Sequence, residues 1–408
     1  MMLLVAPGDN HLPLPEGYKT IDLRVENAVI PDDFHTLYLC KIIKLPDWGR
    51  SHLIRFEPIF QESSYPFIHH MLVFQCSGDM SGLAGVQEPC FNEAQTQFSA
   101  MYSCSTKFVA IWAVGGGPVT YPENMAAPLM GEGQSQYLLL EIHYDNMQYV
   151  KGLPPDNSGM RLFFAPELRP VELGTFVFGM GFSPDALIVP PRQKKFTTRS
   201  FCDFRCTKYF PPEGLTIHSA YLHAHVAATG IRFRHIRNGV ELPLPFEDNH
   251  YDFNYQDLRH IYEPIKMLQN DTFIVECDYD SSRRTEPIFG GFSTLNEMCL
   301  IDLNYYPKIP DLLYCMGNPN EETYAELLGT QLVGTTEDGV KRVVENPFFR
   351  GTNITMHQLA IDFFTNNPAN QQLTEKGERT PLGEIWQRKM DYGIYTQQCY
   401  GENDDAGL

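Results

Sequence analysis

The 408-residue sequence lacks several patterns that would assign it to a common protein class. It has no Cys-x-x-Cys pair and no His-Glu-x-x-His motif, which disfavours a zinc ribbon, a thioredoxin-type redox site and a zinc hydrolase. No apolar run approaches the roughly 18 residues of a membrane-spanning helix. Basic residues are also scarce: 31 Lys and Arg against 50 Asp and Glu give a net charge of −19, which disfavours nucleic acid and anionic membranes as partners.

A leader sequence is not evident either. The segment Met1–Gly8 carries no basic residue and too short an apolar run for a signal peptide. The cysteines nevertheless favour the secretory pathway, since all ten are widely spaced and even in number, and glycosylation sequons begin at Asn270 and Asn353. We therefore predict that the protein is located in the lumen of the secretory pathway or outside the cell.

What the sequence does contain is a β-rich texture. Short runs of Val, Ile, Phe and Tyr recur between turn residues, and 30 prolines with 31 glycines leave room for few long helices. Short helices are expected only at Tyr324–Leu332 and Thr380–Asp391. We predict an all-β fold of β-sandwiches, with strands at Thr36–Leu45, Phe67–Gln75, Phe108–Val114, Gln136–Tyr144, Gly159–Ala165, Leu215–Val226 and Asp271–Tyr279.

The distribution of the cysteines suggests two domains. Four cysteines precede Pro170 and six follow it, so each part can close its own disulfides. We therefore predict an N-terminal domain at 20–170 and a C-terminal domain at 171–400.

Five of the thirteen histidines fall in patterns that suit metal ligands. His223 and His225 form His-x-His in a strand-like run, and side chains two apart on a strand point the same way, so both can reach one metal. The adjacent His69 and His70 would diverge unless the strand is bulged or the rings bind through different nitrogens. Such a pair is more often incidental, and a single histidine in an apolar run, such as His143, is usually a satisfied, half-buried residue. These signals alone indicate a candidate metal protein and nothing finer.

Met298 taken alone would be interpreted as a core residue. Its thioether is a soft ligand that favours Cu(I) over Zn²⁺. Met298 would therefore complete a copper site with His223 and His225 if the fold brings the three together, which spacing cannot show.

A set of motifs occurs in the order and at the intervals of one known family. From about Asp22 to Cys399 the sequence resembles the copper type II ascorbate-dependent monooxygenases, although no single motif would suffice. The motifs are His69-His-Met-Leu-Val-Phe-Gln-Cys76, Trp112-Ala-Val-Gly with Tyr121-Pro-Glu123, Leu140-Glu-Ile-His-Tyr144, Val189-Pro-Pro-Arg192, Pro211-Pro-Glu-Gly214, Leu222-His-Ala-His225, Gly290-Gly-Phe292, and Glu297-Met-Cys299 with Tyr305-Tyr-Pro307.

The resemblance implies two tandem antiparallel β-sandwiches of jelly-roll type, each binding one copper, that face each other across an open, solvent-filled cleft. It implies one copper held by His69, His70 and His143. A second copper, at which catalysis takes place, would be held by His223, His225 and Met298. The implied reaction uses ascorbate as reductant and O2 as co-substrate, and it inserts one oxygen atom into a C–H bond of a small substrate.

The resemblance also implies a disulfide framework that uses every cysteine and leaves none for an intersubunit disulfide. The implied pairs are Cys40–Cys90, Cys76–Cys104, Cys202–Cys315, Cys206–Cys399 and Cys277–Cys299.

The substrate is suggested by departures from the peptide-amidating members of the family. Those members bind the carboxylate of their substrate with residues at positions that here are Tyr221, Leu300 and Asp302. The anion-binding residues are therefore absent, and one of their positions holds a carboxylate. Asp302 could pair with the ammonium group of an arylalkylamine, or it could be solvated or bond a nearby backbone group. Glu141, two residues before His143, also follows the amine hydroxylases.

Two alternatives to an amine hydroxylase stay open at this stage: a secreted copper-binding protein without turnover, and a hydroxylase of a non-amine substrate. The presence of all six implied ligands favours an enzyme. The remaining histidines are expected not to be ligands, and the first exception to look for is His218, which lies just upstream of His-x-His; they are His11, His35, His52, His218, His235, His250, His260 and His357.

Overall fold

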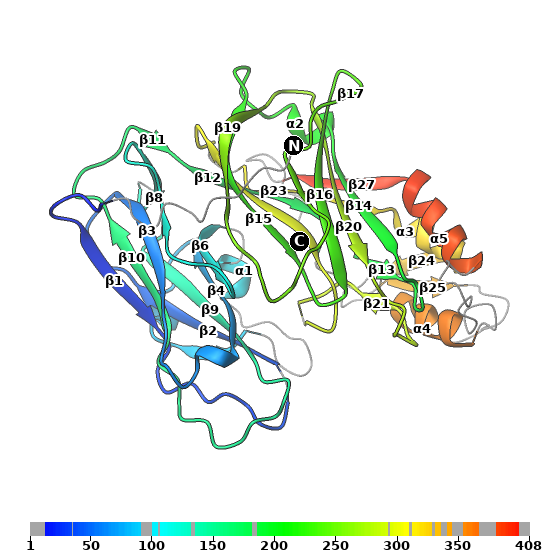
Figure 1. Cartoon of the computed structure of the whole chain (residues 1–408), viewed down its shortest axis with the longest axis horizontal. Helices are drawn as coiled ribbons and strands as arrows, with labels where there is room; N and C mark the ends of the chain where they lie inside the picture. Colours follow the sequence, from blue (N-terminus) through cyan, green and yellow to red (C-terminus); the bar gives the residue numbers. More distant parts are fainter. Residues whose placement is uncertain are drawn as a thin grey trace.

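The computed structural model describes residues 13–399, apart from residues 35, 91–99, 105–106, 132–134, 182–185, 293, 310–311, 329–330, 336–340, 345–353 and 367–380. The described residues form two β-rich halves, the N-terminal half in blue to cyan and the C-terminal half in green to red (Figure 1). Most elements are strands, so the prediction of an all-β fold is confirmed.

The N-terminal half consists of two sheets. A six-stranded sheet has the order β1-β10-β3-β8-β11 with β7 beside β3, and a five-stranded sheet has the order β5-β2-β9-β4-β6. The elements are β1 (Lys19–Arg24), β2 (Thr36–Lys44), β3 (Ser51–Ile59), η1 (Tyr65–Phe67), β4 (Ile68–Gln75), η2 (Ser81–Leu83), β5 (Gln87–Pro89), α1 (Met101–Cys104), β6 (Phe108–Ala113), β7 (Val119–Thr120), β8 (Met125–Leu129), β9 (Tyr137–Asp145), β10 (Gly159–Phe164) and β11 (Val171–Glu172).

Strand β9 shows how side-chain alternation places part of the site. Leu140 and Ile142 enter the core between the two sheets together with residues of β3 and β10. Because successive side chains on a strand point to opposite faces, Glu141 and His143 lie on the other face of the five-stranded sheet. Both are nevertheless buried, and the Cys40–Cys90 disulfide of the same half lies beside Glu141.

The C-terminal half repeats this two-sheet pattern and adds a helical end. A six-stranded sheet has the order β19-β15-β22-β12-β23-β27, and a five-stranded sheet has the order β14-β20-β16-β17 with β18 beside β16; β13 and β21 form a pair, and β24-β25-β26 a small sheet. The elements are β12 (Gly174–Gly179), β13 (Ile188–Val189), β14 (Phe196–Cys202), α2 (Phe204–Thr207), β15 (Leu215–Ala224), β16 (Ala228–Arg237), β17 (Val240–Glu241), β18 (Phe246–Asp248), β19 (Arg259–Met267), β20 (Thr272–Tyr279), β21 (Ile288–Phe289), β22 (Cys299–Tyr306), β23 (Tyr314–Pro319), α3 (Glu321–Leu327), β24 (Gln331–Thr335), β25 (Lys341–Val344), β26 (Ile354–Thr355), α4 (Met356–Asn366), α5 (Pro381–Tyr392) and β27 (Tyr395–Cys399).

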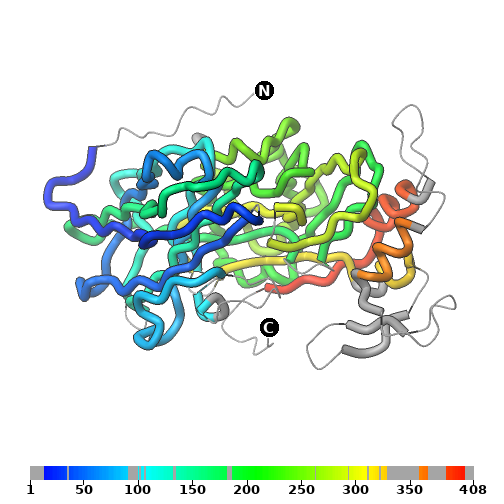
Figure 2. Tube along the Cα trace, turned by 90° about the horizontal axis from the view of Figure 1, so that it is seen from below, coloured from blue at the N-terminus to red at the C-terminus, as the bar shows by residue number. Residues whose placement is uncertain are grey.

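Alternation along β22 places the other part of the site. Cys299 and Ile301 belong to the core of the C-terminal half, so Met298, Leu300 and Asp302 point to the opposite face of the six-stranded sheet. There Met298 and Leu300 pack in a small apolar cluster that Phe108 of the N-terminal half joins. The five-stranded sheet of one half therefore faces the six-stranded sheet of the other, and Figure 2 shows the two halves side by side.

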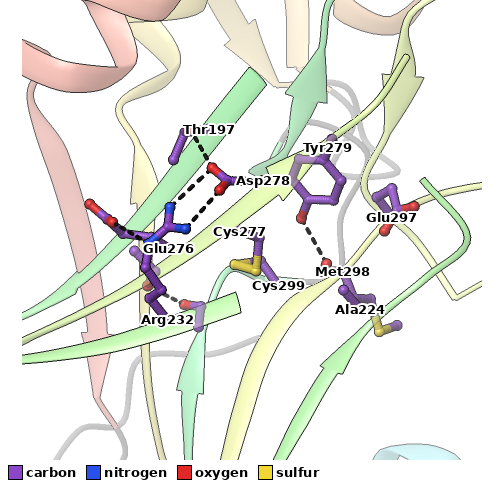
Figure 3. The surroundings of a disulfide bond; sticks show 12 residues. Thr197, Ala224, Arg232, Glu276, Cys277, Asp278, Tyr279, Glu297, Met298 and Cys299 are labelled. Atoms are coloured by element: carbon purple, nitrogen blue, oxygen red, sulfur yellow. Dashed lines mark hydrogen bonds and ion pairs between the residues drawn. A yellow bond between two sulfur atoms is a disulfide. The ribbon is translucent and has the colours of Figure 1, made fainter. Parts of the chain in front are cut away.

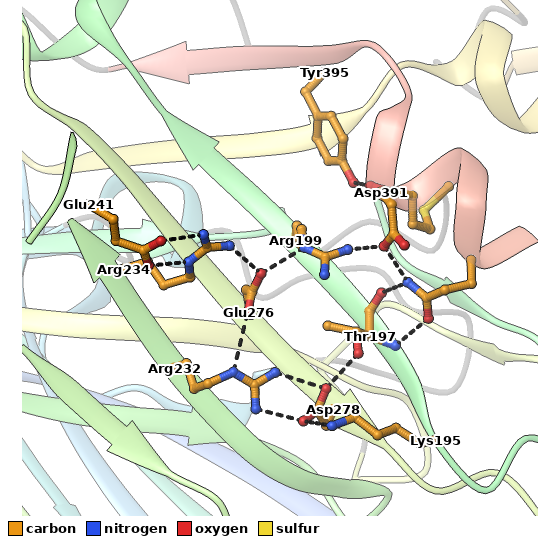
Figure 4. A network of polar contacts seen from close by, with 12 residues as sticks. Lys195, Thr197, Arg199, Arg232, Arg234, Glu241, Glu276, Asp278, Asp391 and Tyr395 are labelled. Atoms are coloured by element: carbon orange, nitrogen blue, oxygen red, sulfur yellow. Dashed lines mark hydrogen bonds and ion pairs between the residues drawn. The ribbon is translucent and has the colours of Figure 1, made fainter. Parts of the chain in front are cut away.

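The outer sheet of the C-terminal half is covered by a ladder of charges (Figure 4). Arg199, Arg232 and Arg234 all donate to Glu276, and Arg232 also donates to Asp278. Since both carboxylates are buried, their shared guanidinium partners satisfy groups that would otherwise be costly inside a protein.

Five disulfides lie within the two halves and none joins one half to the other: Cys40–Cys90, Cys76–Cys104, Cys202–Cys315, Cys206–Cys399 and Cys277–Cys299. They are the five pairs that the resemblance implies. The boundary at residues 170/171 and the jelly-roll connectivity stay predictions.

The structure differs from the sequence-based expectations in three details, one of which is the unexpected helix α4 at Met356–Asn366. The helix expected at Tyr324–Leu332 is the shorter α3 and is followed by strand β24, because the helical pattern ends before a β-prone Gln331–Thr335 run. The sheets are also not wholly antiparallel, since β11 pairs with β8, and β12 with β23, in parallel. None of the described helices combines the length and apolar character needed to cross a membrane.

Candidate metal centre

Three histidines of the N-terminal half converge, and we call them the N-terminal histidine group: His69, His70 and His143. His70 on β4 is directly opposite His143 on β9, and the register shifts between Ile68 and His70, which makes His69 the extra residue of a β-bulge. One ring nitrogen from each histidine lies within 4.8 Å of the others. The bulge therefore resolves the geometric problem that two adjacent histidines pose.

The hydrogen bonds of the three rings determine which nitrogen faces inward. Nε2 of His69 lies 3.2 Å from the backbone oxygen of Phe253, and Nε2 of His143 lies 2.8 Å from the hydroxyl of Thr36. Because a carbonyl only accepts, His69 carries its proton on Nε2 and its lone pair on Nδ1. Nδ1 of His143 is buried and has no hydrogen-bond partner among the described residues.

His70 completes this arrangement. Its Nε2 lies 3.4 Å from a carboxylate oxygen of Glu141, and its Nδ1 lies 3.3 Å from Nδ1 of His69. Burial raises the pKa of Glu141 to about 8, and a cation among the histidines would favour its carboxylate form, to which Nε2 of His70 can donate. The lone pairs on Nδ1 of His69 and Nδ1 of His70 would then face each other at 3.3 Å and repel unless a cation lies between them.

The imidazoles are in the protonation state that a metal requires. Burial lowers the pKa of His69 to about 3 and that of His70 to about 4, and it lowers the pKa of His143 well below its ordinary value. All three are therefore neutral near pH 7 and offer lone pairs.

A second group, the C-terminal donor group, consists of His223, His225 and Met298. The two histidine rings on and just beyond β15 lie 5.2 Å apart between centroids. Nδ1 of His223 lies 2.8 Å from Oε1 of Gln256, and Nδ1 of His225 lies 3.1 Å from the backbone oxygen of Asn296. Both rings therefore donate through Nδ1, which leaves Nε2 for a metal. Burial lowers the pKa of His223 to about 4 and that of His225 well below its ordinary value.

The strand register brings Met298 to the same face as these histidines. Leu300 pairs with His223 and Cys299 with Ala224, so one further step places Met298 opposite His225. Residues opposite each other in a sheet point to the same face. The ladder therefore groups the two imidazoles with the thioether.

Met298 is held from both sides along the chain (Figure 3). Cys299, the next residue, is disulfide-bonded to Cys277, and the hydroxyl of Tyr279 donates to the carbonyl of Met298 at 2.8 Å. The preceding residue, Glu297, accepts the backbone N–H of His225 at 2.8 Å. The backbone on both sides of the thioether is thus tied to neighbouring strands.

The two groups lie against each other. The rings of His70 and His223 are 6.4 Å apart between centroids, and the ring of Phe253 stacks on His69 at 3.9 Å. Phe253 also meets the ring of His225 edge-on at 6.0 Å. An aromatic ring from the C-terminal half thus lies between histidines of the two groups, and the open, solvent-filled cleft stays a prediction that this arrangement does not show.

Asp302 and Tyr221 are neighbours on this interface. They pair directly across β22 and β15, and the Tyr221 hydroxyl donates to the carbonyl of Ile111 in the N-terminal half. Asp302 is 8% exposed, and its Oδ1 has no hydrogen-bond partner within the described part of the chain. Burial raises the pKa of Asp302 to about 7.

The other described histidines lie outside both groups. His52 bonds Glu172, and His235 bonds Asp271. The rings of His218 and His260 face each other at 5.7 Å, but they do not join either group. His250 is exposed; the side chains of His11, His35 and His357 lie outside the described residues.

Several residues that position the donors were missed by sequence reasoning. Thr36, Phe253, Gln256 and Asn296 each contact a donor ring, and Tyr38 stacks on His143 at 4.1 Å. Each is a single residue without periodicity or motif, so only their proximity in the folded chain reveals them.

Both parts of the chain match one protein family. Residues 21–151 match the N-terminal domain of the copper type II ascorbate-dependent monooxygenases, and residues 172–328 match the C-terminal domain. DBH-like monooxygenase protein 1 of Gallus gallus is 33% identical over 323 residues, 78% of this chain and 52% of that protein. Dopamine beta-hydroxylase of Canis lupus familiaris is 32% identical over 297 residues, and MOXD1 homolog 1 of Drosophila melanogaster is 35% identical over 307; each alignment covers 72% of this chain, and 46% and 43% of those proteins respectively.

The chain therefore belongs to the copper type II ascorbate-dependent monooxygenase family, a class of copper oxidoreductases, and the family implies copper and ascorbate as cofactors together with O2. It spans about half the length of the curated relatives it matches. The donors fit copper on their chemistry: imidazole suits copper in both groups, and the thioether selects Cu(I) in the second.

Proposed function

We propose that this chain is an ascorbate-dependent monooxygenase that hydroxylates a C–H bond of a small arylalkylamine. One copper would be held by Nδ1 of His69, His70 and His143, and the other by Nε2 of His223 and His225 with the sulfur of Met298. The observation that carries the proposal is the convergence of buried, neutral imidazoles whose outward nitrogens are all engaged by other groups. When bound, the two coppers supply the electrons and the oxygen activation that the hydroxylation needs.

The chain's own residues orient the donors and exclude water. The hydrogen bonds to the outward nitrogens orient the rings, and the carbonyl acceptors at His69, His223 and His225 also fix the tautomer, as partners of metal-bound histidines generally do. The stacked ring of Phe253 and the apolar neighbours of Met298 remove solvent from the space between the two groups. A dry site protects a reactive oxidant from side reactions.

Asp302 supports an amine as substrate. In an antiparallel sheet, Asp302 is the diagonal neighbour of His223, at a distance of roughly 7–8 Å. A small amine whose ammonium group pairs with Asp302 can therefore place a carbon two bonds from its nitrogen beside the C-terminal donor group. The amine would reach this carboxylate when the Tyr221–Ile111 contact between the halves opens, because Asp302 is covered in the present arrangement.

We also propose the secretory lumen or the extracellular space as the location. Five disulfides suit an oxidising compartment. The sequon at Asn270 is in an exposed turn, where a glycan can be attached without disturbing the core.

The first experiment counts copper and product in the disulfide-bonded protein. The wild type should bind two coppers and hydroxylate tyramine in the presence of ascorbate and O2. Met298→Ala should lose turnover and keep the copper at the N-terminal histidine group. Met316→Ala is the matched control, since Met316 is equally buried at 7% exposure in the same apolar cluster but carries no proposed ligand role.

The results distinguish the proposed enzyme from a copper protein without turnover and from a protein that does not bind two coppers. Binding of one copper or none by the wild type would refute the enzyme proposal. Binding of two coppers with oxidation of ascorbate but no product from any substrate would indicate a copper protein without turnover.

A second comparison tests the amine. Asp302→Asn should lower kcat/KM for tyramine by roughly 10- to 100-fold, as expected for loss of a charged hydrogen bond. It should leave 4-propylphenol, the neutral isostere, nearly unaffected. An equal effect on both substrates would contradict the role of Asp302 and leave the family assignment intact.

A further inference from the structure

A continuous chain of hydrogen bonds joins the two donor groups. Nε2 of His69 donates to the carbonyl of Phe253 at 3.2 Å, and the same oxygen accepts Nε2 of Gln256 at 2.9 Å. Oε1 of Gln256 in turn lies 2.8 Å from Nδ1 of His223. One histidine of each half is therefore linked to the other through a single carbonyl and a single amide.

The donors and acceptors in this series of hydrogen bonds leave each proton only one position. A carbonyl oxygen has no proton, so both His69 and the amide nitrogen of Gln256 must donate to Phe253. The amide is thereby oriented with its oxygen toward His223, which forces Nδ1 of His223 to be the donor. The lone pairs then remain on Nδ1 of His69 and Nε2 of His223, the two atoms that each donor group needs.

The linking segment is fixed to both halves by further contacts. The backbone N–H of Gln256 donates to the carbonyl of Val114, and the N–H of Val114 donates to the carbonyl of His69. The ring of Phe253 lies between His69 and His225. Gln256 and Phe253 are 4% and 7% exposed, so water does not compete strongly for these bonds.

We propose that Gln256 is a positioning residue for both donor groups at once, and that through the Phe253 carbonyl it couples metal binding at the two groups. This rests on the proposed function for the identity of the metal, but not for the hydrogen-bond chain itself. Because coupling between sites is reciprocal, an ordered His223 helps to hold His69, and an ordered His69 helps to hold His223.

The first test uses the metal-free protein. Two-bond ¹H–¹⁵N spectra of the histidine rings report which nitrogen carries the proton. The wild type should show His69 protonated on Nε2 and His223 protonated on Nδ1. Gln256→Leu should release His223 from this single tautomer, whereas Gln387→Leu should change neither ring. Gln387 is the matched control because it is 2% exposed and its amide also bonds backbone, at Thr197, away from both groups.

The second test measures the coupling. His225→Ala weakens the C-terminal donor group and preserves the hydrogen-bond chain, so competition with a Cu(I) chelator then reports the affinity of the N-terminal histidine group. Adding Gln256→Leu should weaken that affinity by about fivefold, the lower end of ordinary coupling between sites, although the side-chain hydrogen bonds of Gln256 go to His223 and Phe253 and not to that group.

Two outcomes would overturn the inference. One is a His223 tautomer that is unchanged in Gln256→Leu; the other is an unchanged affinity of the N-terminal histidine group in the double variant. A wild type that binds no copper would refute the proposed function instead, and the tautomer measurement would still decide whether the hydrogen-bond chain orders the two rings.

Discussion

Asp302 is predicted to destabilise the folded protein above neutral pH, and Asp302→Asn should remove that cost. Burial raises the pKa of Asp302 from 3.8 to about 7. The folded state therefore holds this proton more tightly than the unfolded chain does. Below about pH 4 both states are protonated and the group contributes no difference. Between about pH 4 and 7 only the unfolded chain ionises, so the free energy of unfolding falls, and above about pH 7 the loss is complete.

The magnitude follows from the size of the shift. One pKa unit corresponds to about 1.4 kcal/mol, so a shift of about three units corresponds to at most roughly 4 kcal/mol. The copper-free, disulfide-bonded wild type and Asp302→Asn would be unfolded in denaturant at pH 4 and pH 8. The variant should be more stable at pH 8 by a difference that vanishes near pH 4.

A partnered carboxylate provides the control of opposite sign. Burial alone would raise the pKa of Asp278, but hydrogen bonds from Arg232, Thr197 and Lys195 lower it overall. Asp278→Asn should therefore destabilise the protein at pH 8, and the stability that Asp278 contributes should be lost only below about pH 4. If Asp302→Asn were no more stable than the wild type at pH 8, or shifted stability equally at both pH values, the assignment of an unpaired, buried carboxylate would be wrong.

Two further predictions concern the supports of the donors. Glu141→Leu should weaken copper binding at the N-terminal histidine group by about 10- to 100-fold, because it removes the acceptor of His70; copper titration checks this, and Glu141→Gln, which keeps an acceptor, should retain most of the affinity. Replacing Cys277 and Cys299 together by Ala opens a link that spans 22 residues, which should cost about 3 kcal/mol in denaturant unfolding. The same variant should lose the copper bound with Met298 before the other copper, and equal loss of both would contradict the local role of this disulfide.

The strand pattern could be predicted from the sequence because it depends on short-range signals. Runs such as Thr36–Leu45 and Gly159–Ala165 coincide with β2 and β10 to within one residue at each end. The helix expected at Tyr324–Leu332 begins three residues earlier and ends five residues earlier in the structure, because the positions of helix ends depend on what the chain packs against. Helix α4 was not expected, although Thr355 and Gln358 have the Thr-x-x-Gln spacing of a capping box and Leu359, Phe363 and Phe364 recur at helical spacing.

The candidate site could be predicted only in part. His-x-His on a strand is a local signal, and the register of β15 confirms that His223 and Leu300 share a face. The bulge at His69 is a property of the pairing between β4 and β9, which no residue of the pair encodes alone. Phe253 and Gln256 belong to a loop that follows His223 by about thirty residues, so their contacts with both halves depend on tertiary structure.

The use of different ring nitrogens by the two groups has a structural reason. A ring that offers Nδ1 keeps its ligand atom close to its own backbone, so His69 and His70 can converge only where a bulge brings their backbones together. A ring that offers Nε2 extends away from its strand, so His223 and His225 need no bulge and direct their ligand atoms toward the other half. The outward nitrogen is Nε2 in the N-terminal histidine group and Nδ1 in the C-terminal donor group. One carbonyl and one amide can therefore serve both groups, because the carbonyl of Phe253 accepts from Nε2 of His69 and the amide oxygen of Gln256 accepts from Nδ1 of His223. The short loop that contains Phe253 and Gln256 can therefore hold the N-terminal histidine group and the C-terminal donor group at the same time.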